Sequence, residues 1–266
     1  MHLQHPIAPY QGIPPEDCIF VTNDQMIEIG MGSLTQFWQP EMYPDTPMHI
    51  YLHLDTQPAG RNLLFGALLA RAEQLRAQQP GARARLYTQI APENWEMSNF
   101  FSKAGFKNDD SEDLYHFPLP VWPAIAPVSC TYGSIALRNA QEVEAFLQRV
   151  NAYRITPIDT DFLGQCMQME HFTAIGYYRG GNAVCEALLT GQGQTVTLVS
   201  LYTRSDYRRQ GFAKAILGAA ADILRPRGVT QVSARVYSRC QPQVALMRAA
   251  GGKKIRSVAL LPGMML

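Results

Sequence analysis

The stretch TVTLVSLYTRSDYRRQGFAKAILGAAADIL, residues 195–224, constrains the fold of this 266-residue chain more than any other segment. A strand-forming run at 195–203 leads into a turn that carries Arg208, Arg209 and Gly211, and an apolar-faced helix follows. The first N–H groups of a helix lack internal partners and carry partial positive charge, and glycine lets a ligand approach the backbone closely. With two arginines beside them, these groups predict a pocket for a diphosphate. A basic, solvated helix start is the alternative.

The rest of the second half alternates strands and helices around this junction. Asn139 is a predicted helix N-cap, and Gly180-Gly181 and the GQGQ run at 191–194 predict hairpin turns. The order predicts an α/β fold with a mixed sheet, in which the crossover after 195–203 is right-handed if the joined strands are parallel. We expect strands at 134–137, 171–179, 182–190, 195–203, 231–237 and 254–261, and helices at 140–153, 161–169, 211–224 and 242–250.

Part of this order recurs in the first half of the chain. The landmark glycines Gly60 and Gly211 are 151 residues apart, and Gly105 and Gly251 are 146 apart. Two offsets that agree this closely, with the same elements between them, indicate an internal duplication. Coincidence between two ordinary α/β segments is the alternative. The expected elements here are strands at 48–55 and 84–90 and helices at 60–79 and 95–104.

The segment at 116–130 contains four prolines and no regular period, which predicts an extended linker. The charge balance changes sign nearby: residues 1–129 carry 7 Lys and Arg against 14 Asp and Glu, whereas residues 130–266 carry 16 against 8. The opposite charges favour two halves that attract each other, or a second half that binds an anion. We therefore expect three parts: a domain at 1–120, a linker at 121–130 and a second domain at 131–266.

Cysteine spacing and apolar runs limit the class of protein. The five cysteines form no C-x-x-C motif, which argues against a disulfide framework or a zinc site and favours a reducing, cytoplasmic setting. No signal peptide is recognised, and the longest apolar run, LLFGALLA, is only 8 residues, too short for a bilayer. His49 and His53 have no third ligand nearby in sequence, so we expect no metal site. The net charge of +1 gives no reason to expect nucleic-acid or membrane partners.

The basic turn resembles the acyl-CoA signature [Q/R]-x-x-G-x-[G/A] of the GNAT N-acetyltransferase superfamily. Arg208, Gly211 and Ala213 occupy its three defined positions. The resemblance covers residues 130–266, where the neighbouring elements come in the family order, and extends more loosely to 40–118. It implies the acyl-CoA N-acyltransferase-like fold, in two tandem copies.

The first half resembles the family less closely. In its corresponding hexapeptide, Pro58 removes a backbone donor and Asn62 replaces a small residue. We therefore expect a degenerate GNAT-like domain with poor or no cofactor binding. A later family pattern, N-x-x-A-x-x-L-Y-x-x-x-G-F, is echoed there by Asn94, Phe100, Phe101, Gly105 and Phe106.

The resemblance implies how acetyl-CoA would bind as co-substrate. Its diphosphate would lie on the backbone N–H groups of the basic turn, and its pantetheine arm would pair with the splayed end of the strand at 195–203. Backbone N–H groups near the end of that strand would polarise the thioester carbonyl, and an acceptor amine would attack directly. The expected cofactor-binding residues are Leu201, Tyr202, Thr203, Arg208, Arg209, Gln210, Gly211, Phe212 and Ala213.

Two residues are candidates for proton transfer. Glu186 interrupts the apolar strand AVCEALL, and a partly buried carboxylate with a raised pKa would suit removal of the ammonium proton. A solvent-facing glutamate at the sheet edge is the alternative. The family's usual acid is a tyrosine in the last helix, but Met247 stands there, with Cys240 at the usual asparagine, and methionine has no proton to donate. We therefore expect slower or water-assisted chemistry rather than none, and Tyr237 is the candidate substitute for the acid.

These features predict an N-acetyltransferase that moves an acetyl group from acetyl-CoA to a primary amine. The acidic first half predicts a cationic acceptor, such as a polyamine, an aminoglycoside-like amine or a peptide N-terminus. Tyr202 and Tyr237 are candidate acceptor-site walls, with ordinary core or rim tyrosines as the alternative. Met247 favours a second hypothesis, a non-catalytic acyl-CoA-binding or sensory protein. The apolar tail, Met264–Leu266, is expected to pack on the other half or on a second copy, which leaves a homodimer open.

Overall fold

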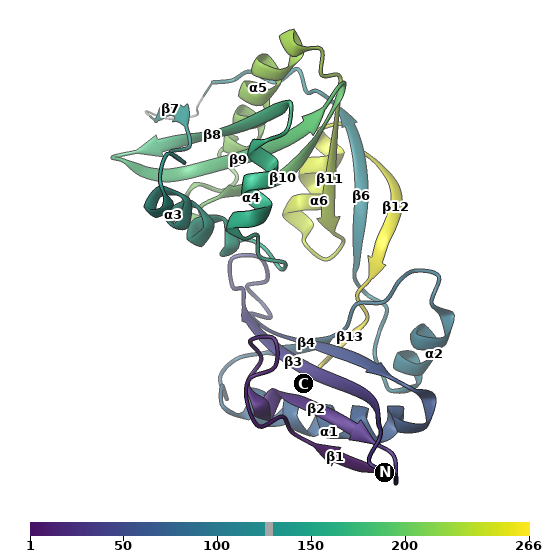
Figure 1. The fold of residues 1–266 in the computed structure, drawn as a ribbon. Coiled ribbons are helices and arrows are strands. Elements are labelled where there is room, and N and C mark those ends of the chain that lie inside the picture. The colour runs from purple at the N-terminus through teal and green to yellow at the C-terminus, as the bar shows by residue number, and fades with distance from the viewer. Residues whose placement is uncertain (126–129) are drawn as a thin grey trace. The chain divides into compact units, whose positions relative to one another are not determined.

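The computed structural model describes residues 1–125 and 130–266, and these divide into two compact units. The first unit comprises Met1–Ser111 and Ala259–Leu266, and the second comprises Glu112–Val258. Each unit has its own sheet and helices (Figure 1). Part of the expected linker, residues 126–129, lies outside the described residues. Among the described residues, no helix combines the length and apolar character needed to span a membrane.

The second unit is built on a 7-stranded sheet with the strand order β12-β6-β11-β10-β9-β8-β7. Strands β8, β9 and β10 are antiparallel neighbours, whereas β10 and β11 are parallel, as a strand–helix–strand crossover requires. Its elements are β6 (Ser111–Pro118), β7 (Thr131–Ser134), α3 (Ala140–Asn151), α4 (Thr160–Met167), β8 (His171–Arg179), β9 (Asn182–Gln192), β10 (Thr195–Thr203), the 3-10 turn η2 (Ser205–Tyr207), α5 (Phe212–Leu224), η3 (Arg225–Arg227), β11 (Gln231–Tyr237), α6 (Gln241–Ala249) and β12 (Lys253–Leu260).

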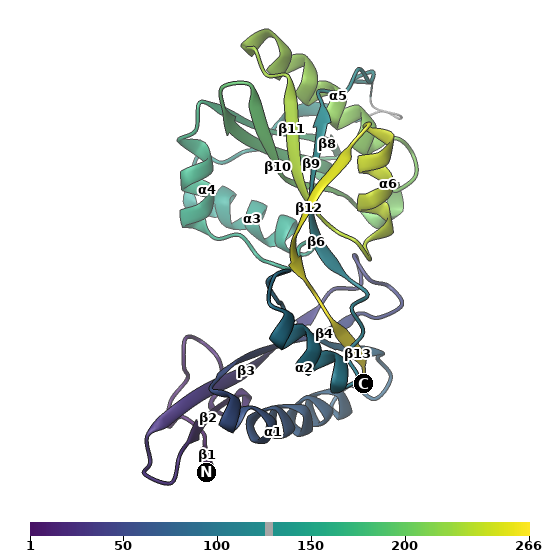
Figure 2. The same ribbon diagram turned by 90° about the vertical axis from the view of Figure 1, so that its right-hand side faces the viewer.

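Helices cover both faces of this sheet (Figure 2). Helices α3 and α4 pack on one face, where Phe146 of α3 and Leu163 of α4 form a cluster with Leu188 of β9. Helices α5 and α6 pack on the other face, where Phe212 and Met247 join the larger core. Successive residues of a strand point to opposite faces, so β9 supplies both cores in alternation.

Local chemistry explains the helix starts that the sequence predicted. The side chain of Asn139 accepts a hydrogen bond of 2.9 Å from the N–H group of Glu142, which confirms the expected N-cap of α3. Asp159 caps α4 in the same way through the N–H group of Phe162, at 2.8 Å. Helix α3 ends two residues earlier than expected, at Asn151, and the strand before it, β7, lies at Thr131–Ser134 rather than at 134–137.

The first unit contains a 6-stranded sheet with the order β1-β2-β3-β4-β5-β13. Helices α1 and α2 pack on one face of it, over a core that includes Leu52, Leu68 and Phe101. The apolar tail contributes to this core through Met264 and Leu266, because β13 pairs with β5. The elements are β1 (His2–Gln4), the 3-10 turn η1 (Pro15–Asp17), β2 (Cys18–Thr22), β3 (Glu28–Trp38), β4 (Met48–Thr56), α1 (Pro58–Ala77), β5 (Ala84–Tyr87), α2 (Trp95–Lys103) and β13 (Gly263–Met265).

Strand β6 shows that the interpretation of the segment at 116–130 as an extended linker is wrong for residues 116–118. Residues 116–118 belong to β6, which lies between β11 and β12 and pairs with β11 from Gln231↔Pro118 to Tyr237↔Glu112. Phe117, only 1% exposed, is part of the core of the second unit. The prolines misled the prediction, because Pro118 stands at the very end of its strand, where a missing N–H donor is tolerated.

Candidate functional site

Strand β10 changes its pairing halfway along its length. Its parallel pairing with β11 runs from Thr195↔Gln231 to Leu198↔Ala234 and no further, although both strands continue. At the same point its register with β9 shifts between Leu198 and Ser200, which marks a β-bulge at Val199. Beyond the bulge, β10 remains paired with β9 alone, so its other edge is open toward β11.

The backbone groups on this open edge can be identified. The N–H group of Arg204 donates to the carbonyl of Val184 at 2.9 Å, and hydrogen-bonded pairs alternate in an antiparallel ladder. Tyr202 therefore faces β9 with its backbone, whereas the N–H and C=O groups of Leu201 and Thr203 point away from β9. This is the splayed strand end that the family resemblance implied for the strand at 195–203.

The segment between β10 and α5 has a special backbone conformation. Arg209 has a φ of +62° and Gly211 a φ of +91°, both in the left-handed region. Gly211 is the N-cap residue of α5, so the N–H groups of Phe212 and Ala213 are among those without partners inside the helix. Turns of this kind gather backbone N–H groups into an anion-binding concavity, and Arg208 and Arg209 add charge. The expected diphosphate fits this donor set.

The first unit has no comparable turn. Its strand β4 and helix α1 are joined by a single residue, Gln57, and the helix begins with Pro58, which has no N–H group. The register of β4 with β3 is continuous from Gly30↔Thr56 to Trp38↔Met48, so this β4 has no bulge. These features support the expectation that the site of the first half is degenerate.

Glu186 lies at the centre of a buried network on the α3 face of the sheet. Its two carboxylate oxygens accept a fork of hydrogen bonds from Arg149 of α3, at 3.0 Å from Nε and 2.9 Å from Nη2. The hydroxyl of Tyr178 donates to the same carboxylate at 3.2 Å, and the hydroxyl of Tyr202 donates to its other oxygen. Glu186 is 1% exposed, which excludes the alternative of a solvent-facing glutamate at the sheet edge.

The electrostatics of this network keep its donors protonated. Burial and the charge of Glu186 raise the pKa of Tyr202 and of Tyr178 above their ordinary value. Burial acts to lower the pKa of Arg149, but its hydrogen bonds and charge interaction with Glu186 outweigh this and raise it. One cationic and two neutral donors therefore surround the carboxylate throughout the physiological pH range.

An aromatic stack connects this network with the basic turn. The rings of Tyr153 and Tyr202 are stacked, with centroids 4.5 Å apart and planes 6° from parallel. The guanidinium of Arg208 lies 5.9 Å from the centroid of the Tyr153 ring, and its Nε donates to the carbonyl of Thr203 at 3.2 Å. The structure thus brings Glu186, Tyr202, Thr203 and Arg208 into one connected group.

Tyr237 lies at the end of β11, outside that group. Its hydroxyl is 3.5 Å from the hydroxyl of Thr156, in the loop that follows α3. Met247, 2% exposed, belongs to the apolar core under α6, and Cys240 is the N-cap residue of that helix. A methionine buried in this way offers the site no donor, as the sequence led us to expect.

Sequence reasoning missed Arg149, Arg154 and the two tyrosines Tyr153 and Tyr178. Arg149 follows Phe146 by three residues on α3, so it lies on the apolar stripe of that helix. A single arginine on a buried helix stripe and a single glutamate in an apolar strand are the signal that could have predicted this ion pair. The other three residues carry no comparable signal.

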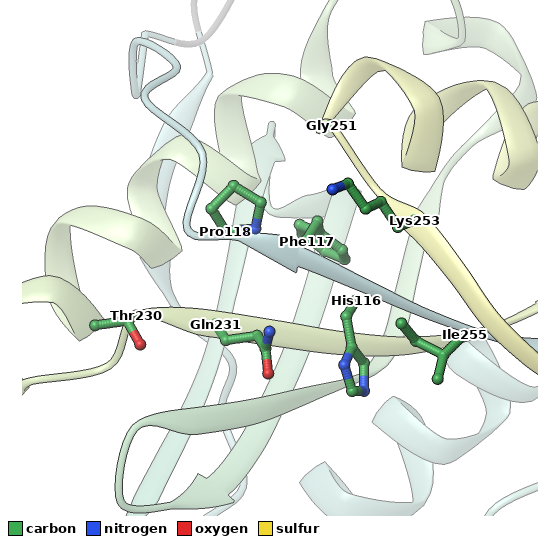
Figure 3. A pocket seen from close by; sticks show the side chains of 8 residues that line it. All are labelled: His116, Phe117, Pro118, Thr230, Gln231, Gly251, Lys253 and Ile255. Atoms are coloured by element: carbon green, nitrogen blue, oxygen red, sulfur yellow. The ribbon is translucent and has the colours of Figure 1, made fainter.

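A shallow pocket of about 340 Å³ lies elsewhere in the second unit, over β6, β11 and β12 (Figure 3). Its lining includes His116, Gln231, Lys253 and Ile255 and none of the residues expected to bind cofactor. Within residues 1–125 and 130–266, no three His, Cys, Asp or Glu side chains gather as metal ligands.

Comparison with known proteins gives a family for part of the chain and a fold for the whole. The family model described as Acetyltransferase (GNAT) family matches residues 142–251. No curated protein matches the chain. Three solved structures are similar in fold: a GCN5-related N-acetyltransferase from Anabaena variabilis (12% identity, TM-score 0.57, 95% of this chain and 63% of that one), a probable N-acyltransferase from Enterococcus faecalis (14%, 0.54, 92% and 61%) and Eis1 from Mycobacterium abscessus (13%, 0.54, 94% and 64%).

The chain spans less than two thirds of the length of these three proteins, and at such identities the likeness concerns the fold alone. The family match, by contrast, covers the bulged strand, the basic turn and α5. Residues 142–251 therefore form a domain of the acetyltransferase (GNAT) family, in a chain whose two mixed α/β sheets fit two tandem copies of that fold.

Proposed function

We propose that the protein is an N-acetyltransferase that moves an acetyl group from acetyl-CoA to a primary amine. The observation that carries the proposal is the combination of the open β10 edge with the left-handed turn at Arg209 and Gly211, next to each other in one unit. An open strand edge offers backbone pairing to an extended amide-containing arm, and the turn offers N–H groups to a diphosphate. Acetyl-CoA presents both features in one molecule.

Each part of the site has a distinct role in this proposal. The N–H groups from Arg209 to Ala213, with the side chains of Arg208 and Gln210 nearby, bind the diphosphate. The open edge at Leu201 and Thr203 orients the pantetheine arm. Backbone N–H groups of this edge donate to the thioester carbonyl as negative charge develops on its oxygen, and such preorganised donors contribute strongly to acyl transfer.

Glu186 is the proposed acceptor of the ammonium proton. Its carboxylate is fully engaged by Arg149, Tyr178 and Tyr202, so a proton reaches it only through one of those donors. Tyr178 is only partly buried, and in this proposal its hydroxyl gives its own proton to Glu186 and takes up the proton of the ammonium group. Tyr237, with its hydroxyl beside Thr156, is the proposed source of the proton for the leaving thiolate.

Replacing Gly211 by leucine tests the proposed cofactor site. A ligand at 100 times its Kd stabilises a protein by about 2.7 kcal/mol, which raises the melting temperature by several degrees in a chain of this size. A side chain at Gly211 obstructs the diphosphate and strains a φ of +91°. We expect Gly211→Leu to lose most of the shift in melting temperature that acetyl-CoA gives the wild-type protein.

The matched control is Gly228→Leu in the same unit. Gly228 also has a left-handed backbone, with φ of +81°, and a Cβ there would meet nothing within 4 Å. This variant has the same backbone strain but leaves the turn intact, so its acetyl-CoA shift should match the wild type. Gly60 is a poorer control, because a Cβ there would lie 3.0 Å from Thr56 and Val21. An unchanged shift in Gly211→Leu would refute the proposed cofactor site.

The proposed acceptor is a small cationic molecule or a peptide N-terminus. Support comes from the excess of Asp and Glu over Lys and Arg in residues 1–129, 14 against 7, which favours positively charged substrates electrostatically. We expect acetyl transfer to polyamines and aminoglycoside-like amines to exceed transfer to neutral amines of similar size by at least about tenfold in kcat/KM at low salt, and the difference to shrink as salt screens the charges. Equal rates across such a panel would remove the basis for a cationic acceptor.

A non-catalytic acyl-CoA-binding or sensory role is the second candidate. Met247 favours it, because this buried side chain occupies the place of the family's usual proton donor and has no proton to give. Calorimetry with acetyl-CoA, together with detection of free thiol in the presence of a broad amine panel, separates the two functions. Tight binding without release of thiol would support the sensory role.

A further inference from the structure

Three residues of β10 have backbone carbonyls on the open edge, in the part of the strand that is no longer paired with β11. They are Val199 at the bulge, Leu201 and Thr203, whose backbone groups are not used in the ladder with β9. These residues are half-buried, and a carbonyl left out of the ladder accepts instead from a side chain, a ligand or water. The structure shows side-chain donors for two of the three.

Arg154 donates to the carbonyl at the end of the edge where β10 leaves β11. Its Nη1 donates to the carbonyl of Val199, and its Nε donates to the carbonyl of Thr156 at 3.0 Å. Burial lowers the pKa of Arg154, and the neighbouring Tyr237 and Glu112 act in the opposite direction. The guanidinium is therefore partly buried and binds β10 at the bulge, where the pairing of β10 with β11 ends.

Arg208 donates to the carbonyl at the other end of the edge, next to the basic turn. Its Nε donates to the carbonyl of Thr203 at 3.2 Å, and its guanidinium lies over the ring of Tyr153, 5.9 Å from the centroid. Tyr153 precedes Arg154 directly in the chain and stacks on Tyr202 of β10. A single dipeptide, Tyr153-Arg154, therefore contributes to holding both ends of the open edge.

The loop that carries this dipeptide is fixed at its base. The side chain of Asn151, the last residue of α3, donates to the carbonyl of Ile158 and accepts from its N–H group, both at 2.9 Å. These two hydrogen bonds close the loop from 152 to 157 into a compact turn. Arg154 is therefore presented to β10 from a constrained backbone, and less conformational entropy is lost when it binds the bulge.

We propose that Arg154 is a positioning residue for the pantetheine arm. Together with Arg208, it occupies the two outer carbonyls of the open edge, those of Val199 and Thr203. The carbonyl of Leu201 is then left as the acceptor for an amide N–H group of the arm. The inference rests on the proposed function and adds the register in which the arm pairs. A shift by one pairing position along the edge would meet a carbonyl already bound by a guanidinium. The thioester is thereby placed at a fixed distance from the diphosphate turn.

Carbon-13 NMR of backbone carbonyls tests this register in the wild-type protein. We expect acetyl-CoA to shift the carbonyl resonance of Leu201, which gains a hydrogen bond, and to leave those of Val199 and Thr203 near their original positions. A shift at Val199 or Thr203 with none at Leu201 would overturn the register. Absence of any spectral change with acetyl-CoA would instead refute the proposed function, so the two failures are distinguishable.

Arg154→Met tests the positioning role through binding of two probes. ADP reaches only the diphosphate turn, so its Kd should stay within about threefold of the wild type, whereas the Kd of acetyl-CoA should rise roughly tenfold or more because the arm loses its register. In Arg154→Lys, one ammonium group replaces the two donors of the guanidinium, so the Kd of acetyl-CoA should lie between those of the wild type and Arg154→Met. This variant keeps the test usable if the methionine variant folds poorly. Arg179→Met, at an exposed arginine in the same unit, is the control and should leave both values unchanged.

Turnover gives a second readout. Misplacing reacting groups by about 1 Å can cost on the order of a hundredfold in rate, so kcat of Arg154→Met should fall roughly tenfold to a hundredfold even at saturating acetyl-CoA. A merely structural role would lower the melting temperature and leave kcat and the ratio of the two Kd values unchanged. That outcome would overturn the inference while leaving the cofactor site intact.

Discussion

Residues 131–266 expressed alone should fail to fold, whereas residues 112–258 should fold and bind acetyl-CoA. The first fragment follows the division expected from proline content and charge, and it lacks β6. That strand is an interior member of the second sheet, paired with β11 along its whole length and neighboured by β12. Without it, β11 and β12 lose their shared neighbour and the core loses Phe117.

The expected effect exceeds what a domain of this size tolerates. Truncating a buried phenylalanine costs about 3–5 kcal/mol by itself, and single domains are stable by about 5–15 kcal/mol in all. Fragment 131–266 also keeps β13, whose partner β5 belongs to the first unit. Two open strand edges, at β11 and β13, add an aggregation hazard.

Circular dichroism with urea unfolding measures the difference. We expect a cooperative transition for fragment 112–258 and none for 131–266, and an acetyl-CoA shift in melting temperature for the first fragment alone. A cooperative transition in 131–266 would contradict the assignment of β6 to this sheet. Fragment 1–111 joined by a short linker to 259–266 serves as the corresponding control for the first unit.

The sequence predicted the second half well because its periodicities are strong. The hairpin strands at 171–179 and 195–203 and the strand at 231–237 begin and end in the structure where the pattern placed them. Strand β3 was missed because Gly30 and Gly32 interrupt its pattern. Both glycines stand where a side chain would collide with a neighbour: a Cβ on Gly30 would lie 2.2 Å from Thr56, and one on Gly32 2.5 Å from Leu68.

The candidate site likewise has one part that could be predicted from the sequence and one part that could not. The open edge and the basic turn lie within one continuous segment, so their chemistry could be predicted from local sequence. The ion pair of Arg149 with Glu186 joins positions on a helix and a strand that local patterns do not relate. The contact of Arg154 with Val199 likewise depends on how the loop after α3 returns to the sheet. Such contacts are set by tertiary packing, which a single sequence does not show.

Arg149→Met should lower the free energy of unfolding by about 3 kcal/mol. Removing one partner of a buried ion pair leaves the other charge without compensation, which typically costs 3–5 kcal/mol. The lower end applies here because the side chain of Arg149 is 37% exposed, so water reaches its place, although Glu186 is 1% exposed. Urea unfolding of the full chain, monitored in the second unit, measures this change.

The double variant Arg149→Met with Glu186→Leu is the matched control for that loss. Because both charges are then absent, the penalty of an unpaired carboxylate disappears. Replacing a buried ion pair by apolar residues often changes the free energy of unfolding little. The hydroxyls of Tyr178 and Tyr202 lose their acceptor in this variant, so we expect it to remain about 1–2 kcal/mol below the wild type. A double variant less stable than Arg149→Met would show that the pair contributes more than mutual charge compensation.

Glu186→Gln separates this structural role from the proposed proton transfer. Glutamine keeps the shape and can still accept hydrogen bonds from Arg149 and a tyrosine, but it cannot take up the ammonium proton. If Glu186 is the base, turnover should fall by about 10²–10⁴ while the Kd of acetyl-CoA stays close to the wild-type value. If turnover instead tracks stability across Arg149→Met and Glu186→Gln, the network holds Tyr202 and its strand in place, and the acceptor's proton leaves by another route.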